Sequence, residues 1–349
     1  MKHETGTCLW SSIRDELASQ ITRGNLKPGA PFLTADDLSA RYKVSNITSR
    51  RVLDELAGMN LIRRVKGKGS YIKEPPPCNE IFLVIESDIG LATILQHHIY
   101  SEINRGVLLA ASEAGVKVTT VSPDYVVLAS ETDKKLNVIT IQGIFKNKAA
   151  LDYISGGNVN SVCCHATSSK PGILSILEPL KEGAVMMTEH LISKGHRRIA
   201  FIMPQNQHKW FKSRFEGYHE TMMKHELPFS FELVKEAFEE KSSVSDKVEE
   251  LFALSKPPTA IFAATDLIAL HVLKYCQENK IKVPKELSVG GFDNRPECFI
   301  STPPLTSIDT QWMEQGRIAV KTLLKMISGE KGNERSITIA PRLVLREST

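Results

Sequence analysis

The segment from residue 34 to residue 72 constrains the fold of this chain more than any other. Its pattern predicts a helix over residues 34–42, a short turn at Lys43 and Val44, and a second helix that opens on Ser45. A basic Gly-x-Gly hairpin follows at residues 66–72. Two helices joined by a tight turn and followed by a hairpin are typical of a winged helix-turn-helix, which places a helix N-terminus in the DNA major groove. Sequence-specific binding of double-stranded DNA is therefore the leading hypothesis.

The net charge of +4 is unevenly distributed along the chain. Residues 1–77 contain 13 Lys and Arg against 8 Asp and Glu, whereas the remainder contains 31 against 32. The positive excess falls entirely on the first domain, where release of counterions from a phosphate backbone would use it. A chance fluctuation of a few charges is the alternative interpretation.

The candidate DNA contacts lie near the start of the second helix of this motif and in the hairpin. An apolar residue at every fourth position predicts an earlier helix over residues 9–21, and Ser45 is a favourable N-cap for the helix that would enter the groove. Side chains near that N-terminus and on the basic hairpin reach base edges or phosphates. The candidates are Thr34, Ser45, Asn46, Thr48, Ser49, Arg50, Arg51, Lys66 and Lys68.

The rest of the chain has a different pattern of apolar residues. From Ile81 onward, short Val and Ile runs alternate with amphipathic stretches, which predicts parallel sheets covered by helices on both faces. Ligands in such folds bind at the carboxyl ends of the strands. We expect a small α+β winged helix-turn-helix domain at 1–74, a stiff proline linker at 75–79, and an α/β domain at 80–349. That α/β domain forms either one large doubly wound sheet or two lobes.

The cysteines and the N-terminus indicate the cellular setting. The six cysteines show neither metal-ligand spacing nor a disulfide framework, and Cys163-Cys164 lies in an apolar run typical of a buried strand. There is no basic-then-apolar signal segment and no run of about eighteen apolar residues. We expect a cytoplasmic protein with reduced thiols and no membrane partner. Without a Ser/His/Asp elbow, a paired-carboxylate motif or a metal-spaced cluster, we expect no catalysis, metal or cofactor.

The first domain resembles the GntR family of winged-helix regulators over nearly its whole length. The family's recognition-helix pattern, Val-Ser-Arg-x-Thr-Val-Arg-x-Ala-Leu, aligns with residues 44–53, and its wing pattern, Gly-x-Gly-(Ser/Thr)-(Tyr/Phe)-Val, aligns with residues 67–72. Asn46 replaces the family's first arginine. Because Arg favours guanine and Asn favours adenine in bidentate contacts, we expect the operator to differ at that base pair.

Residues 80–345 look like the effector-binding core of the LacI/GalR repressors, itself similar to periplasmic sugar-binding proteins. The matching segments are 189–201, 214–218, 258–266, 283–294 and 304–308. The resemblance implies a two-lobed periplasmic-binding-protein-like domain with parallel sheets. It also implies an effector cleft between the lobes, hinges near 165–175 and 293–310, and dimerisation through this domain.

The same resemblance implies a set of effector contacts. The arginine of Arg-x-x-Gly-Tyr and the aspartate of Gly-Phe-Asp face the cleft in LacI-type proteins, and here they are Arg214 and Asp293. An arginine fork and a carboxylate can hold adjacent hydroxyls of a polyol, although a bridge that only closes the cleft is the alternative. The family also places cleft-lining side chains at His208 and Trp210. Trp210 either stacks on a sugar ring or packs on the lobe surface.

Three further positions complete the expected effector site. Phe238 falls where the family often has an aromatic that sandwiches the ligand, and a core phenylalanine is the alternative. His165 ends a strand of the first lobe, where it is either a ligand contact or a solvated loop histidine. Thr265 stands where sugar-binding members often carry Asn, which shortens the reach and removes an amide donor. The family's ligands therefore cannot be transferred directly to this chain.

Together these features predict a homodimeric DNA-binding regulator, a repressor rather than an activator, that binds a roughly palindromic operator. A small molecule, a sugar or sugar derivative, would bind between the lobes and control DNA binding. The alternative keeps DNA binding but has a vestigial cleft and a protein corepressor. The missing signal segment argues against a transport protein, and the body does not resemble the transaminase domain that some GntR relatives carry.

Overall fold

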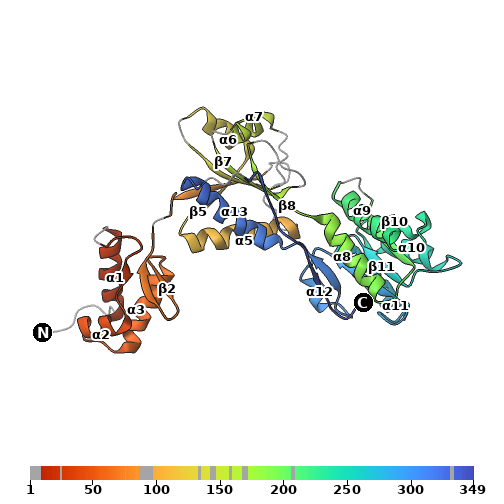
Figure 1. Ribbon diagram of the computed structural model, residues 1–349, viewed down its shortest axis with the longest axis horizontal. Helices are drawn as coiled ribbons and strands as arrows, with labels where there is room; N and C mark the ends of the chain where they lie inside the picture. The colour runs from red at the N-terminus through yellow and green to blue at the C-terminus, as the bar shows by residue number, and fades with distance from the viewer. Residues whose placement is uncertain are drawn as a thin grey trace. The chain divides into compact units, whose positions relative to one another are not determined.

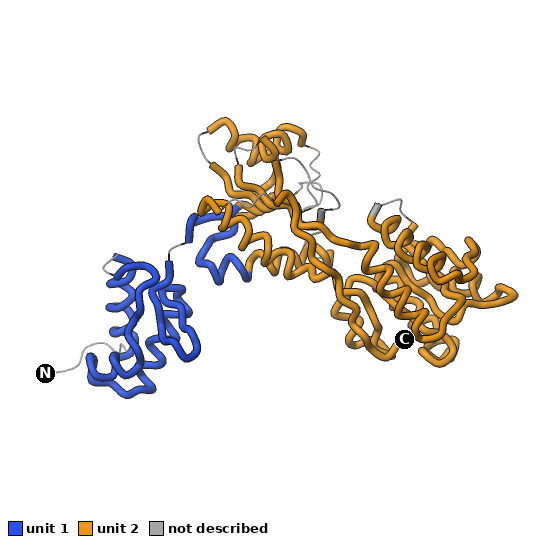
Figure 2. The backbone as a smooth tube through the Cα atoms, in the orientation of Figure 1, with its two compact units in different colours: residues 1–81, 109–118 blue, residues 82–108, 119–349 orange. Residues whose placement is uncertain are grey.

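The computed structural model describes residues 9–23, 26–74, 76–85, 97–132, 135–141, 147–156, 159–166, 172–205, 209–330 and 334–349. The chain forms two compact units, one of residues 1–81 with 109–118 and the other of residues 82–108 with 119–349 (Figure 2). Within the described residues, no helix combines the length and the apolar character needed to cross a membrane.

The first unit contains a winged helix-turn-helix. Its helices are α1 (Leu9–Thr22), α2 (Ala35–Tyr42) and α3 (Asn46–Gly58) (Figure 1). Its antiparallel strands, in the order β1-β3-β2, are β1 (Pro31–Phe32), β2 (Ile62–Val65) and β3 (Gly69–Ile72). Leu17, Leu38 and Leu56 are fully buried where the helices meet. The segment 109–118 also clusters here, and Asn60 Nδ2 donates to the Ser112 carbonyl at 2.6 Å.

Capping hydrogen bonds fix where α2 and α3 begin. Thr34 Oγ1 accepts from the Asp37 amide at 3.1 Å, and Asp37 Oδ2 accepts from the Thr34 amide at 2.9 Å, which forms a capping box. Ser45 Oγ accepts from the Thr48 amide at 3.2 Å. Lys43 adopts the left-handed conformation that ends α2 and turns the chain into α3. The predicted helix start at residue 34 and the Ser45 cap are therefore confirmed.

A six-stranded sheet, ordered β14-β8-β7-β6-β4-β5, forms the first lobe of the second unit. The strands are β4 (Glu80–Val84), β5 (Lys117–Val121), β6 (Asn137–Ile141), β7 (Asn160–Ala166), β8 (Leu174–Leu177) and β14 (Ser336–Thr338). The pairs joining β4, β6, β7, β8 and β14 are parallel. The lobe's helices are α5 (His98–Ala114), α6 (Pro123–Ser130), α7 (Lys148–Ser155) and α13 (Trp312–Ile327). Cys163 and Cys164 are buried in β7, as predicted.

The second lobe is built on a sheet ordered β10-β9-β11-β12-β13-β15. Its strands are β9 (Ile199–Pro204), β10 (Val234–Ala237), β11 (Ala260–Ala263), β12 (Ser288–Phe292), β13 (Thr306–Asp309) and the antiparallel β15 (Arg342–Val344). Its helices are α8 (Leu180–Ser193), α9 (Lys209–Lys224), the short η1 (Phe231–Leu233), α10 (Lys241–Phe252), α11 (Asp266–Glu278) and α12 (Glu297–Ile300). Ile199 and Phe201 pack in one core cluster and Ala200 and Ile202 in another, so helices cover both faces, as predicted.

The chain passes between the two lobes three times. It crosses at 178–179 between β8 and α8, at 310–311 between β13 and α13, and at 339–341 between β14 and β15. Helix α13 packs against β6 and β7 of the first lobe, whereas α8 packs against β11 and β13 of the second. The first crossing lies beyond the expected hinge at 165–175, because β8 continues to Leu177. The second crossing begins at residue 310, at the end of the expected hinge at 293–310. The sequence did not indicate the third crossing.

Asp266 is a fully buried carboxylate beneath β12. Ser307 Oγ donates to Oδ1 at 2.6 Å, and the Arg295 amide donates to Oδ2 at 2.8 Å. A Cβ atom at Gly291 would lie 2.2 Å from Oδ1, so this position requires glycine. Burial, and then the nearby Asp293 carboxylate, raise the pKa of Asp266 to about 7.

The variant Asp266→Asn is expected to show a smaller loss of stability between pH 5 and pH 8 than the natural protein. Because the folded pKa of Asp266 exceeds the ordinary value of 3.8, its stabilising contribution is full below pH 3.8 and is lost as the pH rises to about 7. The loss of unfolding free energy from pH 5 to pH 8 should be smaller in the variant than in the natural protein by on the order of a few kcal/mol. Urea unfolding at both pH values measures it, with the exposed Asp246→Asn as control. An unchanged difference would contradict the assignment.

Candidate functional site

The N-terminal turn of α3 presents polar and apolar side chains outward. Asn46 and Arg50 are exposed, and Asn46 Nδ2 donates to Asp36 Oδ1 of α2 at 2.6 Å. Thr48 is half-buried, and its hydroxyl lies 2.9 Å from Ser45 Oγ. Asn46 and Arg50 are therefore the exposed polar groups of this turn, with Asn46 held by Asp36, while Ser45 and Thr48 hold its backbone. The exposed Thr34 has the same capping role on α2.

Ser49 does not point outward, so its prediction as a DNA contact is wrong. Ser49 is fully buried, and its Oγ lies 2.9 Å from Ser39 Oγ of α2. The reason is helical spacing, because Ser49 shares the inner face of α3 with Val52 and Leu56. Arg51 is exposed, with its guanidinium 4.0 Å from the centre of the Trp10 ring of α1.

The hairpin between β2 and β3 exposes the two predicted lysines. Lys66 and Lys68 are both exposed at the turn, where Gly67 and Gly69 adopt positive φ angles of 75° and 102°. Tyr71 Oη donates to the Lys68 carbonyl at 3.1 Å, which fixes the turn. A hollow of about 540 Å³ lies between this hairpin and the start of α2, lined partly by Thr34, Arg64 and Lys66. The surface suits an anionic chain that follows the hairpin.

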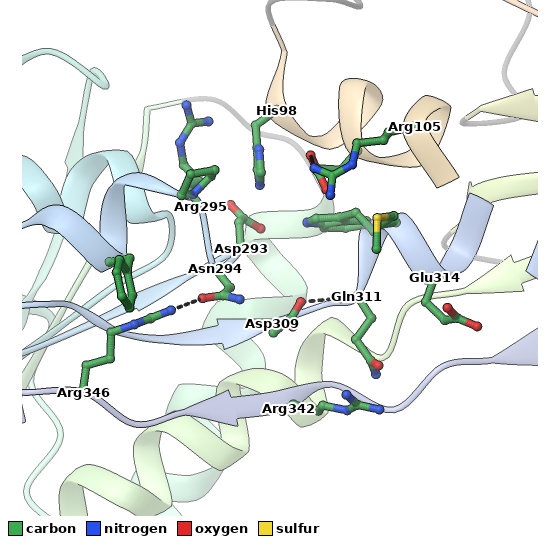
Figure 3. A pocket seen from close by; sticks show the side chains of 15 residues that line it. His98, Arg105, Asp293, Asn294, Arg295, Asp309, Gln311, Glu314, Arg342 and Arg346 are labelled. Carbon is green, nitrogen blue, oxygen red and sulfur yellow. Dashed lines mark hydrogen bonds and ion pairs between the residues drawn. The ribbon is translucent and has the colours of Figure 1, made fainter. Parts of the chain in front are cut away.

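A cavity of about 490 Å³ lies between the two lobes of the second unit (Figure 3). His98, Glu102 and Arg105 of α5 contribute from the first lobe, and residues 293–296 after β12 contribute from the second. The other lining residues are Phe299, Asp309, Gln311, Trp312, Met313, Glu314, Arg342 and Arg346. Four arginines and four carboxylates share this lining, so the cavity offers many donors and acceptors without an excess of either charge.

Several lining groups are already held in place by other protein atoms. Arg346 donates to Asn294 Oδ1 at 2.7 Å and to the Leu305 carbonyl at 2.6 Å. Arg105 and Glu102 form an ion pair at 3.1 Å, and Asp309 accepts from the Gln311 amide at 2.7 Å. The polar wall is therefore preorganised, which lowers the entropy lost when a polar ligand binds.

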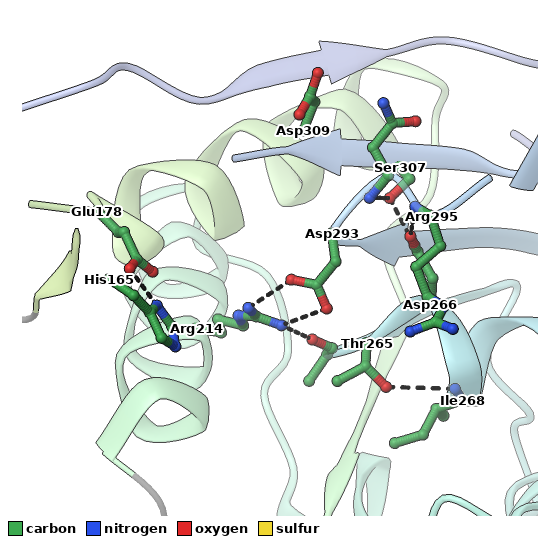
Figure 4. A network of polar contacts seen from close by, with 12 residues as sticks. His165, Glu178, Arg214, Thr265, Asp266, Ile268, Asp293, Arg295, Ser307 and Asp309 are labelled. Atoms are coloured by element: carbon green, nitrogen blue, oxygen red, sulfur yellow. Dashed lines mark hydrogen bonds and ion pairs between the residues drawn. The ribbon is translucent and has the colours of Figure 1, made fainter. Parts of the chain in front are cut away.

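Arg214 and Asp293 form a buried bidentate ion pair at the edge of this cavity (Figure 4). Arg214 Nη2 donates to Asp293 Oδ1 at 2.8 Å, and Nη1 donates to Oδ2 at 3.5 Å and to the carbonyl of Ala264. The guanidinium also lies 3.8 Å from the centre of the Phe292 ring. Asp293 lines the cavity, whereas Arg214 lies behind it. In this structure the two residues form the bridge that the sequence left as the alternative to ligand contact.

His165 is buried rather than solvated, which overturns the loop-histidine interpretation. Its Nδ1 pairs with the buried Glu178 carboxylate of the first crossing. Its ring centre lies 4.3 Å from that of Trp210 and 5.1 Å from that of Trp312, at the start of α13. Its backbone amide donates to Gln315 Oε1 at 3.1 Å, and its φ is 54°. His165 therefore joins both lobes and two crossings, and Trp210 packs on it.

Thr265 and Phe238, two further predicted residues, do not line the cavity. Thr265 is buried as the N-cap of α11, and its Oγ1 donates to Glu239 Oε1 at 2.6 Å. Phe238 follows β10 and is 59% exposed, so it is not a core residue. His208 lies outside the described residues. Among the described residues, no group of three or more His, Cys, Asp or Glu is placed to hold a metal ion.

Comparison with known proteins agrees with this architecture. Residues 9–72 match the bacterial regulatory proteins of the gntR family, and residues 188–349 match the periplasmic binding protein-like domain. The arabinose metabolism transcriptional repressor of Geobacillus stearothermophilus is 25% identical, over 97% of this chain and 96% of that protein. The HTH-type transcriptional repressor PurR of Aliivibrio fischeri is 33% identical over 175 residues, which are 50% of this chain and 52% of that repressor. The match thus spans about half of PurR.

Solved structures show the same fold. A LacI-family regulatory protein from Chloroflexus aggregans superposes with a TM-score of 0.65 at 20% identity, over 77% of this chain and 98% of that one. The transcriptional regulator CelR in complex with cellobiose gives 0.62 at 22% identity, over 88% and 92%. The chain therefore combines a gntR-type winged helix-turn-helix domain with a periplasmic-binding-protein-like domain whose structural neighbours are LacI-family regulators.

Removing one partner of the buried ion pair is expected to destabilise the second unit strongly. Asp293→Asn or Arg214→Met leaves a buried group without its counter-charge, which costs about 3–5 kcal/mol of unfolding free energy. The double variant should recover part of that loss. Urea unfolding measures both effects, with Glu189→Ala as control because its pair with Lys224 is solvent-exposed and worth at most about 1 kcal/mol. Equal, small losses in all variants would show that the pair is not a structural element.

Proposed function

We propose that this chain is a transcriptional repressor whose binding to an operator is controlled by a small molecule held between the lobes. The main support is that one chain contains both a winged helix-turn-helix with exposed basic groups and a two-lobed domain with a polar interlobe cavity. Similarity to a metabolic repressor over nearly the whole chain supports the same function. The named relatives are regulators, which supports a role without catalysis.

The proposed DNA contacts follow from exposure and chemistry. Asn46 keeps its Oδ1 and one Nδ2 hydrogen available beside the bond to Asp36, which suits the N6 and N7 edge of adenine. Arg50 reaches a guanine edge or a phosphate. Lys66, Lys68 and Arg51 neutralise phosphates, while the capped N-termini behind Thr34 and Ser45 turn their amides toward the anionic backbone.

The proposed effector is a sugar or a sugar derivative. A cavity of about 490 Å³ lies within the range of about 300–1,000 Å³ typical of small-molecule sites. Its mixed carboxylates and guanidinium groups can accept from and donate to neighbouring hydroxyls. The structural relative CelR is described in complex with cellobiose, which supports a carbohydrate class. A sugar ring that stacked on Trp210 would have to displace His165 from it.

The three crossings supply the proposed route of control. A ligand that contacts α5 on one side and residues 293–296 on the other favours one relative arrangement of the lobes. If the DNA-binding units of a dimer are spaced differently in that arrangement, operator affinity changes. A coupling free energy of about 1–3 kcal/mol gives a change of about 5- to 150-fold.

A protein corepressor is the second candidate function, and one observation favours it. Arg214, His165 and Thr265, which the sequence predicts as effector contacts, already bond to Asp293, Glu178 and Glu239. A vestigial cleft would have recognition groups that are paired with other protein groups in this way. In that case DNA binding would respond to a partner protein and to no sugar.

Selection of bound duplexes from a random pool, with and without a carbohydrate library, tests the proposal. We expect a two-fold symmetric site whose retention changes with one class of sugar.

Replacing Arg50 by Ala should abolish retention of the duplex. Replacing Arg23, an exposed arginine at the end of α1, by Ala should not. Arg342→Ala, in the cavity wall, should weaken the sugar effect, and the exposed Arg197→Ala should leave it intact. No enriched site would refute DNA regulation, and an enriched site that no sugar alters would favour the corepressor.

The proposed homodimer predicts a dependence on the exposed apolar end of α12. Phe299 and Ile300 are consecutive and 74% and 78% exposed, and a palindromic operator requires two DNA-binding units. Phe299 also lines the interlobe cavity, so the change is made at Ile300 alone. Ile300→Asp should convert a dimer to a monomer in sedimentation and reduce operator affinity at least tenfold. The control Phe231→Asp changes an equally exposed apolar residue on η1. A dimer that survives Ile300→Asp would place the interface elsewhere.

A further inference from the structure

Ile47 is an apolar side chain in the groove-facing turn of α3. It is the second residue of the helix, between Asn46 and Thr48, and 83% of its surface is exposed, more than that of any other large apolar residue among the described ones. The inner face of α3 is formed by Ser49, Val52 and neighbouring residues. The core of this unit therefore makes no use of Ile47.

The side chains around Ile47 indicate what kind of surface it meets. Asn46 and Arg50 are polar and exposed on the same turn of helix, and Arg51 adds a second guanidinium. A protein partner that buried Ile47 would also have to cover these groups. The major groove of DNA instead offers phosphates and base edges to the polar groups, and one apolar group, the C5-methyl of thymine.

We propose that Ile47 reads a thymine of the operator by packing its side chain on that C5-methyl group. The inference rests on the proposed DNA-binding function and assigns a base to a residue within it. Because Asn46 and Ile47 are adjacent in one helical turn, the thymine lies within about two base pairs of the base contacted by Asn46. Asn46 is held by Asp36 at 2.6 Å, so this turn combines a fixed polar reader with an apolar one.

The expected effect is modest and measurable. Removing one buried methyl group lowers affinity about fourfold, from about 0.8 kcal/mol for each buried CH₂ or CH₃ group. Deoxyuridine lacks only the C5-methyl and keeps the hydrogen-bonding edge of thymine. Replacing one thymine by deoxyuridine therefore isolates the apolar contact from every polar one.

The experiment uses the full chain and the duplex enriched from a random pool. Each thymine of one half-site is replaced in turn by deoxyuridine, and affinities are measured by fluorescence anisotropy for the natural protein, Ile47→Ala and Ile47→Val. We expect one thymine whose replacement weakens the natural protein and Ile47→Val about fourfold. For Ile47→Ala, the same replacement should change affinity less than twofold. Met59→Ala is the matched control, because Met59 is 47% exposed at the opposite end of α3.

Each other outcome overturns the inference in a distinguishable way. If deoxyuridine has equal effects on the natural protein and Ile47→Ala at every position, Ile47 does not read thymine. If Ile47→Ala changes the sedimentation of the protein but not its base preference, the side chain belongs to a protein interface. If no duplex is enriched, the proposed DNA-binding function itself fails, and the inference fails with it.

Discussion

The chain passes between the two lobes of the second unit three times, and these passages limit how the lobes can move relative to each other. They lie at 178–179, 310–311 and 339–341, and residues at the second passage and beside the third line the interlobe cavity. Glu178 belongs to the first passage, Gln311 to the second, and Arg342 follows the third. Because a domain joined by three short connections can bend at few places, relative motion of the lobes must act on these residues.

Two buried polar pairs limit how the proposed ligand could bind between the lobes. The pair of Arg214 and Asp293 lies within the second lobe, whereas His165 and Glu178 join the end of β7 to the first passage. In a low-dielectric interior, each pair is stable only while both partners stay together. A ligand that used one of these groups would have to replace its present partner. A ligand could use Asp309, Arg342 and Arg346 of the cavity wall at a lower cost in free energy, because these residues are more exposed to solvent.

The sequence was sufficient for the first unit where local chemistry decides the structure. The start of α2 near Thr34, the Ser45 cap and the Gly-x-Gly hairpin of the wing depend on residues within a few positions of each other, and the sequence predicts all three. The capping role of Thr34 itself is visible only in the structure. Ser49 was misplaced because a small polar residue near an N-terminus looks like a contact, although helical spacing puts it inside.

Predictions for the second unit were weaker because its site is assembled over long distances. The alternation of strands and helices gave the parallel sheets, and the Arg214 and Asp293 pair followed from family motifs. The buried environment of His165 depends on Glu178, Trp312 and Gln315, and no local pattern links residues so far apart. The sequence alone does not single out Ile47, because a lone apolar residue beside polar ones carries no signal until its exposure is known.

We propose that a sugar bound between the lobes and a duplex bound by the winged helix-turn-helix influence each other. The most direct measurement is the affinity of the full chain for a sugar that alters its DNA binding, by calorimetry, with and without saturating duplex. We expect two sugar affinities that differ by about 5- to 150-fold, the same factor by which the sugar changes the affinity of the protein for the duplex. Equal sugar affinities in the two titrations would contradict it.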